Sequence, residues 1–206
     1  MNRVILYIDG FNLYHGLRDK GDKSLYWLDL PALGRNLLTG DQQLVHTHYF
    51  TARIVAAGRS TQDDVRRQST YLDALAAQPN LTIHYGKFLA KQAGCRQCQA
   101  TWTTFEEKQS DVNLGLELTI DAFRDLFDTA LVISADSDLS SPIQRVIKEH
   151  PKKRVVVGFP PKRQSDHLKR IAPCFTIGEN RLRQSQLPET VLSASGYPLT
   201  RPPTWR

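Results

Sequence analysis

Two short apolar runs, more than a hundred residues apart, each lead into aspartates. The first covers residues 4–8 and is followed by Asp9, and the second covers residues 130–134 and is followed by Asp136 and Asp138. Short runs rich in β-branched residues are typical of buried parallel strands. The carboxyl ends of parallel strands line the crevice where ligands bind. We therefore expect these three carboxylates to converge there and to hold a hard divalent cation.

The remaining patterns predict that strands and helices alternate along the chain. Helices are expected between strands near residues 3–8, 44–52, 81–85, 130–134, 154–159 and 174–177. Alternation of this kind predicts an α/β fold, a three-layer α/β/α sandwich around a mostly parallel, doubly wound sheet. The helix expected over residues 111–127 is apolar nearly all round, which predicts that it is largely buried.

A β-hairpin is expected to interrupt this alternation near residues 87–105, where two β-prone stretches flank Cys95 and Cys98. The CxxC pair is half of a zinc knuckle, because tetrahedral zinc normally takes four protein ligands. The others would come from His84 and Cys174 or from a second subunit, so the sequence allows a structural Zn²⁺ and a homodimer. The alternative is reduced thiols without metal. Three cysteines argue against a disulfide framework.

Length and composition favour one α/β domain. The chain has 206 residues, of which 40% are hydrophobic, and we divide it into a domain over residues 1–178 and a basic, proline-containing arm or tail over residues 179–206. No apolar stretch approaches the roughly 18 residues of a membrane span. The first apolar run meets Asp9 too early for a signal peptide. We expect a soluble, cytoplasmic protein without a membrane partner.

Positive charge is concentrated in one part of the sequence. The chain has a formal net charge of +6, and residues 139–170 alone hold nine basic and two acidic residues. This stretch either forms solvated faces of two surface helices or neutralises the phosphates of a nucleic acid. On the second interpretation, the candidate contacts to RNA, with one lysine outside the stretch, are Lys108, Arg145, Lys152, Lys153, Lys162 and Arg163.

A fourth carboxylate, Asp111, stands at the start of the helix expected over residues 111–127. Aspartate is favoured at a helix N-terminus for capping alone. Together with the three strand-end aspartates, however, it would form an all-oxygen cluster, which prefers Mg²⁺ or Mn²⁺ to zinc. Carboxylates, metal and a basic surface indicate hydrolysis of phosphodiester bonds, in which the metal activates water and stabilises the charge on the phosphate.

Three blocks of this sequence resemble the signature blocks of NYN-domain proteins, which belong to the PIN-like nuclease superfamily. The blocks are Tyr7-Ile8-Asp9-Gly10-Phe11-Asn12, Glu107-Lys108-Gln109-Ser110-Asp111-Val112-Asn113 and Ser134-Ala135-Asp136-Ser137-Asp138. The resemblance covers about residues 3–178 and implies a Rossmann-like, PIN-like fold and a metal-dependent ribonuclease, with endoribonuclease activity expected. By resemblance, the acidic metal-site positions are Asp9, Asp111, Asp136 and Asp138. The polar positions that support the site are Asn12 and Ser134.

Two other functions compete with the ribonuclease. One is a non-catalytic module of the same fold that binds RNA or a protein. The other is a nucleotide-sugar transferase in which Asp136 and Asp138 hold Mn²⁺ and a diphosphate, but this function gives Asp9 and Asp111 no role. A phosphatase of the haloacid-dehalogenase type would need Asp-x-Asp after the first strand, where the sequence has Asp9-Gly10-Phe11. The ribonuclease uses all four carboxylates, so it is the function that we predict.

Overall fold

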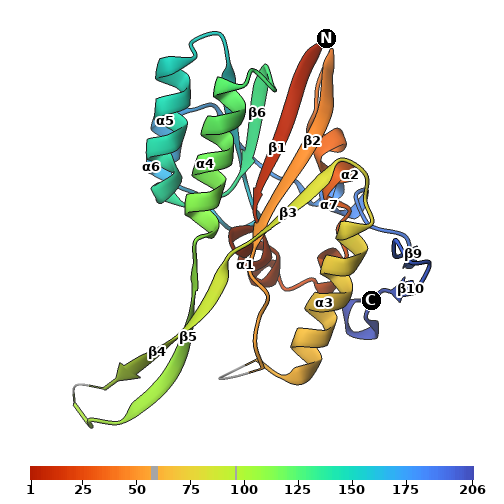
Figure 1. Cartoon of the computed structure of the whole chain (residues 1–206), viewed down its shortest axis with the longest axis vertical. Coiled ribbons are helices and arrows are strands. Elements are labelled where there is room, and N and C mark those ends of the chain that lie inside the picture. Colours follow the sequence, from red (N-terminus) through yellow and green to blue (C-terminus); the bar gives the residue numbers. More distant parts are fainter. Residues whose placement is uncertain (57–59, 96) are drawn as a thin grey trace.

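The computed structural model describes residues 1–56, 60–95 and 97–206, and a parallel sheet lies at its centre (Figure 1). Six strands lie in the order β3–β2–β1–β6–β7–β8, and all neighbouring pairs are parallel. The strands are β1 (Asn2–Asp9), β2 (Gln42–Thr51), β3 (Leu81–Tyr85), β6 (Thr129–Ile133), β7 (Arg154–Phe159) and β8 (Cys174–Thr176). The predicted doubly wound α/β sandwich is confirmed.

The central strands are apolar because helices cover both of their faces. Alternate residues of β1 enter separate cores, with Leu6 and Ile8 in one and Ile5 and Tyr7 in the other. All five residues of β6 are buried. A strand in this position needs a nearly continuous apolar run, since neither face meets solvent. This is why the two apolar runs identified from the sequence form the middle of the sheet.

Helices form a layer on each side of the sheet (Figure 1). One layer contains α1 (Gly10–Lys20), α2 (Leu30–Leu37), α3 (Gln62–Ala76) and α7 (Glu179–Arg183), and the other contains α4 (Ser110–Phe123), α5 (Ser140–Glu149) and α6 (Asp166–Ile171). The short 3₁₀ helices η1 (Lys23–Tyr26) and η2 (Ser137–Leu139) lie in connections, and η3 (Pro203–Trp205) follows the last strand. Among the helices that the structure describes, none has the length and apolar character needed to cross a membrane.

The strand order reverses direction between β1 and β6. From β1 the chain proceeds outward to β2 and β3, and it then returns through α4 to β6 on the other side of β1. In open α/β sheets, such a reversal leaves a crevice at the carboxyl ends of the two strands. Asp9 ends β1 at this crevice, and the turn after Ile133 ends β6 there.

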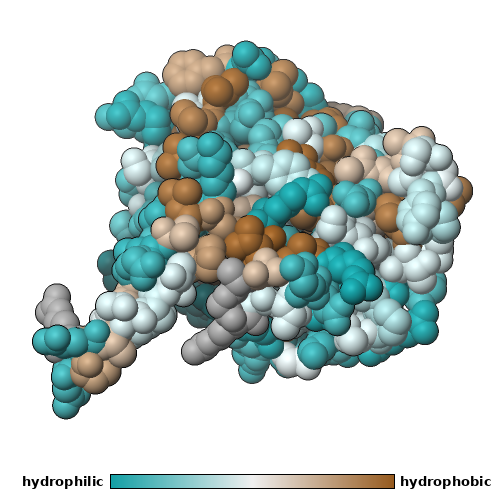
Figure 2. All heavy atoms as spheres, turned by 60° about the horizontal axis from the view of Figure 1, so that its bottom comes forward, coloured by the Kyte–Doolittle hydropathy of each residue, from teal (hydrophilic) through white to brown (hydrophobic). Residues whose placement is uncertain are grey.

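An antiparallel hairpin projects from the carboxyl edge of the sheet (Figures 1 and 2). It consists of β4 (Lys87–Gly94) and β5 (Thr101–Lys108), which pair with each other and form a sheet of their own. We call residues 87–108 the arm. The arm leaves the end of β3 and returns directly into α4, so its base lies beside the crevice and its tip lies far from the domain. The hairpin predicted near residues 87–105 is confirmed.

Helix α4 is half exposed, so the prediction that it is largely buried is wrong. Its inner face packs on the sheet and consists of Leu114, Leu118, Asp121 and Ala122. Its outer face is apolar but exposed by between 38% and 66%, and it consists of Val112, Leu116, Ile120 and Phe123. No element in the described part of the chain covers this outer face. Apolar composition alone therefore overestimated how many neighbours the helix has.

The segment after residue 178 folds onto the domain, whereas the sequence led us to expect an arm or a tail. It forms α7, a hairpin of β9 (Thr190–Leu192) and β10 (Pro198–Thr200), and η3. Leu182 and Leu187 are buried in the core that also contains α2 and α3. Trp27 donates its indole N–H to the Pro188 carbonyl at 2.8 Å. Isolated apolar residues make these contacts, so the sequence shows no periodic pattern there.

We predict that Leu182→Ala lowers the free energy of unfolding by about 2–5 kcal/mol, because Leu182 is fully buried and its truncation leaves a cavity. Leu192→Ala in the same segment is the matched control. Leu192 is 63% exposed, so its loss is expected to change stability by about 0.5 kcal/mol or less. Urea denaturation of both variants measures the difference. Equal midpoints for the two variants would contradict the packed position of this segment.

Candidate metal centre

Asp9 is a buried carboxylate with both oxygens held by hydrogen bonds. It ends β1, caps the N-terminus of α1 and is only 4% exposed. The backbone N–H of Asn12 donates to its Oδ1 at 2.9 Å, and the Ser134 hydroxyl donates to its Oδ2 at 2.8 Å. The next residue is Gly10, and a larger residue would not fit at this position. A Cβ there would lie 2.6 Å from the Phe50 carbonyl oxygen. The position of the Asp9 carboxylate is therefore fixed.

The turn after β6 is joined to Asp9 through Ser134 and Asn12. The Ser134 hydroxyl oxygen accepts the backbone N–H of Asp136 at 2.9 Å. The Asn12 side-chain oxygen accepts the backbone N–H of Ala135 at 3.2 Å. Asp136 then caps η2 by accepting the backbone N–H of Asp138 at 2.9 Å. The two residues named as supporting positions thus connect the ends of β1 and β6.

Asp111 belongs to the same electrostatic site, although it comes from a different element. It lies in the first turn of α4, and desolvation followed by the negative charges of Asp136 and Asp138 raises the pKa of its carboxyl group. Burial, and then the charges of Asp111 and Glu107, raise the pKa of Asp9 to about 7, against the lowering effect of its hydrogen bonds. The charges that act on Asp9 and Asp111 are therefore those of other carboxylates. We call Asp9, Asp111, Asp136 and Asp138 the carboxylate cluster.

Glu107 is a fifth acidic residue at this site, in addition to the four aspartates that the sequence predicts. It stands at the end of β5, half-buried, and accepts a hydrogen bond from the Ser110 hydroxyl. Burial and the charge of Asp111 raise the pKa of its carboxyl group. The neighbouring Glu106 faces solvent and pairs with Lys91 and Lys108. The sequence did contain a sign of this difference. Successive side chains of a strand point to opposite faces, so only one of two adjacent glutamates can face the site.

The six predicted RNA contacts do not lie on one track. Lys108 ends β5 beside the cluster, and Lys162 and Arg163 follow β7 at the same carboxyl edge of the sheet. Lys152 and Lys153 precede β7 and therefore lie at the amino ends of the strands, where Lys153 pairs with Asp125. The remaining basic residue, on α5, pairs within its own helix: Arg145 with Glu149 at 3.2 Å. The basic stretch spans both ends of β7, so nearness in sequence did not give nearness in space.

A hollow at the base of the arm lies next to the cluster. Its lining, which we call the aromatic hollow, consists of Arg53, Tyr85, Gly86, Lys87, Phe88 and Leu89. A Cβ on Gly86 would lie 2.6 Å from the Lys108 carbonyl and from the Ser110 hydroxyl, which shows how closely this base approaches α4. The Arg53 guanidinium lies 5.1 Å from the centre of the Tyr85 ring. The hollow therefore offers aromatic rings and the cationic Lys87, while Arg53 also pairs with Asp73 at 3.5 Å.

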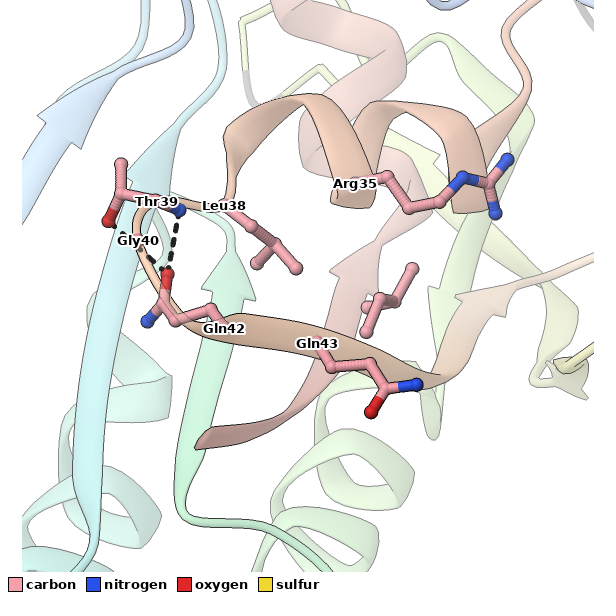
Figure 3. A pocket seen from close by; sticks show the side chains of 7 residues that line it. Arg35, Leu38, Thr39, Gly40, Gln42 and Gln43 are labelled. Atoms are coloured by element: carbon pink, nitrogen blue, oxygen red, sulfur yellow. Dashed lines mark hydrogen bonds between the residues drawn. The ribbon is translucent and has the colours of Figure 1, made fainter. Parts of the chain in front are cut away.

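A second hollow lies far from the cluster, between α2 and the start of β2 (Figure 3). Its lining consists of Arg35, Leu38, Thr39, Gly40, Gln42, Gln43 and Leu44. The Gln42 side-chain oxygen accepts the backbone N–H of Thr39 at 3.0 Å and so closes the turn. Arg35 is the one ionisable residue among the residues that line it, so this hollow presents no carboxylate. We therefore base the proposed function on the carboxylate cluster.

The donors in the carboxylate cluster are those that a hard cation prefers. All are carboxylate oxygens, which suit Mg²⁺ or Mn²⁺ better than zinc. The pKa values of Asp9 and Asp111 are raised by burial and by the charges of neighbouring carboxylates. No basic residue contributes to either shift. Within the described ranges, no three His, Cys, Asp or Glu side chains already stand close enough to hold an ion. The chemistry of the donor set fits a cation, and its binding requires the carboxylates to draw together.

The chain is similar to known proteins in family, sequence and fold. The NYN domain family matches residues 3–179. The chain is 27% identical to the 6-hydroxy-3-succinoylpyridine 3-monooxygenase of Pseudomonas putida over 242 aligned positions, which span 98% of this chain and 75% of that protein. It is also similar to the crystal structure of a protein of unknown function from Vibrio parahaemolyticus, with a TM-score of 0.55 and 17% identity over 90% of this chain and 96% of the other. The latter likeness concerns the fold alone.

We predict that the metal-free protein loses stability as the pH rises from about 4 to about 7. The ordinary pKa of Asp9 is 3.8 and the folded state raises it to about 7. Protonated Asp9 thus favours folding, and this contribution is lost as the pH rises through the folded pKa. Asp9→Asn removes the titration and is expected to be more stable at pH 7, by up to about 4 kcal/mol.

Thermal denaturation in EDTA across this pH range measures the effect. Asp63→Asn, which removes an exposed carboxylate on α3, is the matched control. Its stability is expected to depend on pH as that of the unchanged protein does. If the stability of Asp9→Asn and of the unchanged protein depended on pH in the same way, Asp9 would not be a buried carboxyl group with a raised pKa.

Proposed function

This chain belongs to the NYN domain family, and from that premise we propose that it is a metal-dependent ribonuclease that cleaves RNA internally. The observation that carries the proposal is the carboxylate cluster at the crevice between β1 and β6. Three separate elements contribute to it, β1, α4 and the turn after β6. Asp9 and Asp136 also cap α1 and η2, but capping does not explain why Asp111 and Asp138 face the same site, whereas a divalent cation would use all four carboxylates.

The chemistry follows from the donors. When bound, Mg²⁺ or Mn²⁺ would activate a water molecule and stabilise the charge that develops on the scissile phosphate. Asp9 would hold the cation in a fixed position because Ser134 and Asn12 orient its two oxygens. Asp111 and Asp136 would approach from α4 and from the turn after β6. Ligands that fix the geometry around the cation are the main contribution of a protein to metal-assisted hydrolysis.

The aromatic hollow supports single-stranded RNA as the substrate. Unpaired bases stack on aromatic side chains, and basic groups beside them contact the phosphates. Tyr85 is 43% exposed there, and Arg53 and Lys87 stand next to it. Tyr85 ends β3 and Asp9 ends β1, so the hollow and the carboxylate cluster lie at the same carboxyl edge of the sheet. A strand whose base stacks on Tyr85 would therefore lead its phosphates toward the cluster.

A second candidate function is monooxygenation of a small hydroxylated ring compound. The similarity to the Pseudomonas putida monooxygenase over 98% of this chain favours it. A monooxygenase needs a source of electrons for the second oxygen atom, which a nicotinamide cofactor commonly supplies. Here β1 ends at Asp9 and is followed by Gly10-Phe11-Asn12, which differs from the glycine-rich turn that binds dinucleotides. The carboxylate cluster has a direct use in the nuclease, which we therefore prefer.

We predict cleavage of a labelled single-stranded RNA in Mn²⁺ and no cleavage in EDTA. Asp136→Asn is expected to lower the rate about 100-fold or more, because it removes a metal ligand. Asp63→Asn removes a carboxylate on α3 and is expected to keep full activity. Gel electrophoresis distinguishes internal fragments from single released nucleotides. Full activity of Asp136→Asn would contradict the site, and tight RNA binding without cleavage would favour the binding module.

Oxygen consumption with 6-hydroxy-3-succinoylpyridine and a reduced nicotinamide tests the second candidate. The nuclease predicts no substrate-dependent consumption. Turnover of this compound that survives Asp136→Asn, together with intact RNA in Mn²⁺, would replace the nuclease by the monooxygenase.

We predict that Tyr85→Ala weakens binding of single-stranded RNA about tenfold, because one stacked base contributes roughly 1–3 kcal/mol. Tyr197→Ala is the matched control, since Tyr197 is 67% exposed on the hairpin of β9 and β10. Fluorescence anisotropy in EDTA measures binding without cleavage. An equal affinity of both variants would exclude the aromatic hollow as the binding surface.

A further inference from the structure

The tip of the arm is closed by backbone hydrogen bonds that hold both cysteines at its end. The ladder of β4 and β5 continues to the pair formed by Gly94 and Thr101. Beyond it, the Cys95 N–H donates to the Ala100 carbonyl at 2.8 Å, and the Gln99 N–H donates to the Cys95 carbonyl at 2.8 Å. Cys95 and Cys98 thus follow the last pair of the ladder, at the end of the arm.

Groups near Cys95 also favour its thiolate form, which is the form that binds metal. Backbone N–H groups of Gln97 and Cys98, together with the Cys98 thiol, face the Cys95 sulfur and lower the pKa of the Cys95 thiol. The thiolate is the form that binds zinc. Hydrogen bonds to a ligand atom orient it and are typical of metal sites. Both thiols are free, and Cys98 is exposed.

Neither His84 nor Cys174 of the same chain lies near enough to complete the site. His84, which the sequence suggested, lies in β3 with its Nε2 2.9 Å from Nδ1 of His48, so it stands at the base of the arm. Eight strand residues separate base from tip, a distance of about 25 Å. Cys174 lies in β8, at the opposite edge of the sheet from β3. In the part of the chain that the structure describes, no cluster of three His, Cys, Asp or Glu is suited to a metal.

A second copy of the chain can supply an identical pair. The arm projects away from the rest of the domain (Figures 1 and 2), so the arm of a second copy can approach its end. Two pairs related by a twofold axis would present four thiolates to one ion, and such closed symmetry is the commonest in homo-oligomers. Four thiolates in tetrahedral geometry form a typical structural zinc site.

We propose that Cys95 and Cys98 form half of a Zn²⁺ site that the same two residues of a second copy complete. The zinc ion would join two arms tip to tip, with one carboxylate cluster at the base of each arm. Because the site is separate from the clusters, this inference does not depend on the proposed nuclease function.

The test uses the full chain, purified in reductant and supplied with ZnSO₄. Elemental analysis and light scattering are expected to give one zinc per two chains and a twofold molar mass, which EDTA returns to the monomer value. The Cys95→Ser, Cys98→Ser double variant is expected to bind no zinc and to stay monomeric, with an unchanged far-ultraviolet circular dichroism spectrum. Cys174→Ser is the matched control and keeps both zinc and dimer. Replacement of zinc by Co²⁺ is expected to give the visible absorption of a tetrahedral thiolate complex.

Four results would overturn the proposal. They are one zinc per monomeric chain, zinc retained by the double variant, no zinc bound at all, and a dimer that EDTA leaves intact. The last result would indicate that contacts other than zinc join the copies.

Discussion

The hydrogen bond from the Ser134 hydroxyl to the Asp9 carboxylate joins the two strands at which the sheet reverses direction. It holds a carboxylate that is almost fully buried, a position that is unfavourable for a charge without a partner. The Asn12 backbone N–H occupies the other oxygen of Asp9, and the Asn12 side chain holds the turn after β6. The geometry of the candidate metal centre depends on this small set of bonds.

The rest of the molecule places further groups around that point. Helix α4 brings Asp111, and the arm that precedes α4 brings Glu107 on its returning strand. The same arm forms the aromatic hollow at its base and carries the cysteine pair at its tip. One insertion between β3 and α4 therefore links a charged site, a surface suited to stacking and a candidate contact to a second copy.

The sequence predicted the elements whose environment is uniform. β1 and β6 are apolar on both faces, so their runs were visible, and the aspartates that follow them could be placed at one edge of the sheet. The sequence did not predict which sides of an element are buried when its environment differs from one side to the other. Half of α4 is exposed although its outer residues are as apolar as its inner ones, as Leu116 and Leu118 show. Lys153 and Lys162 are close in sequence but lie at opposite ends of β7, since a strand separates them.

The central claim is that the carboxylate cluster binds a divalent cation, and calorimetric titration of Mn²⁺ at pH 6 tests it most directly. Because the pKa of Asp9 is raised to about 7, most of the free protein carries a proton there at this pH, and binding must displace it. Titrations in buffers of different ionisation enthalpy report that proton. The account predicts binding with release of about one proton, which Asp9→Asn abolishes. Absence of Mn²⁺ binding, or binding that Asp9→Asn leaves unchanged, would contradict it.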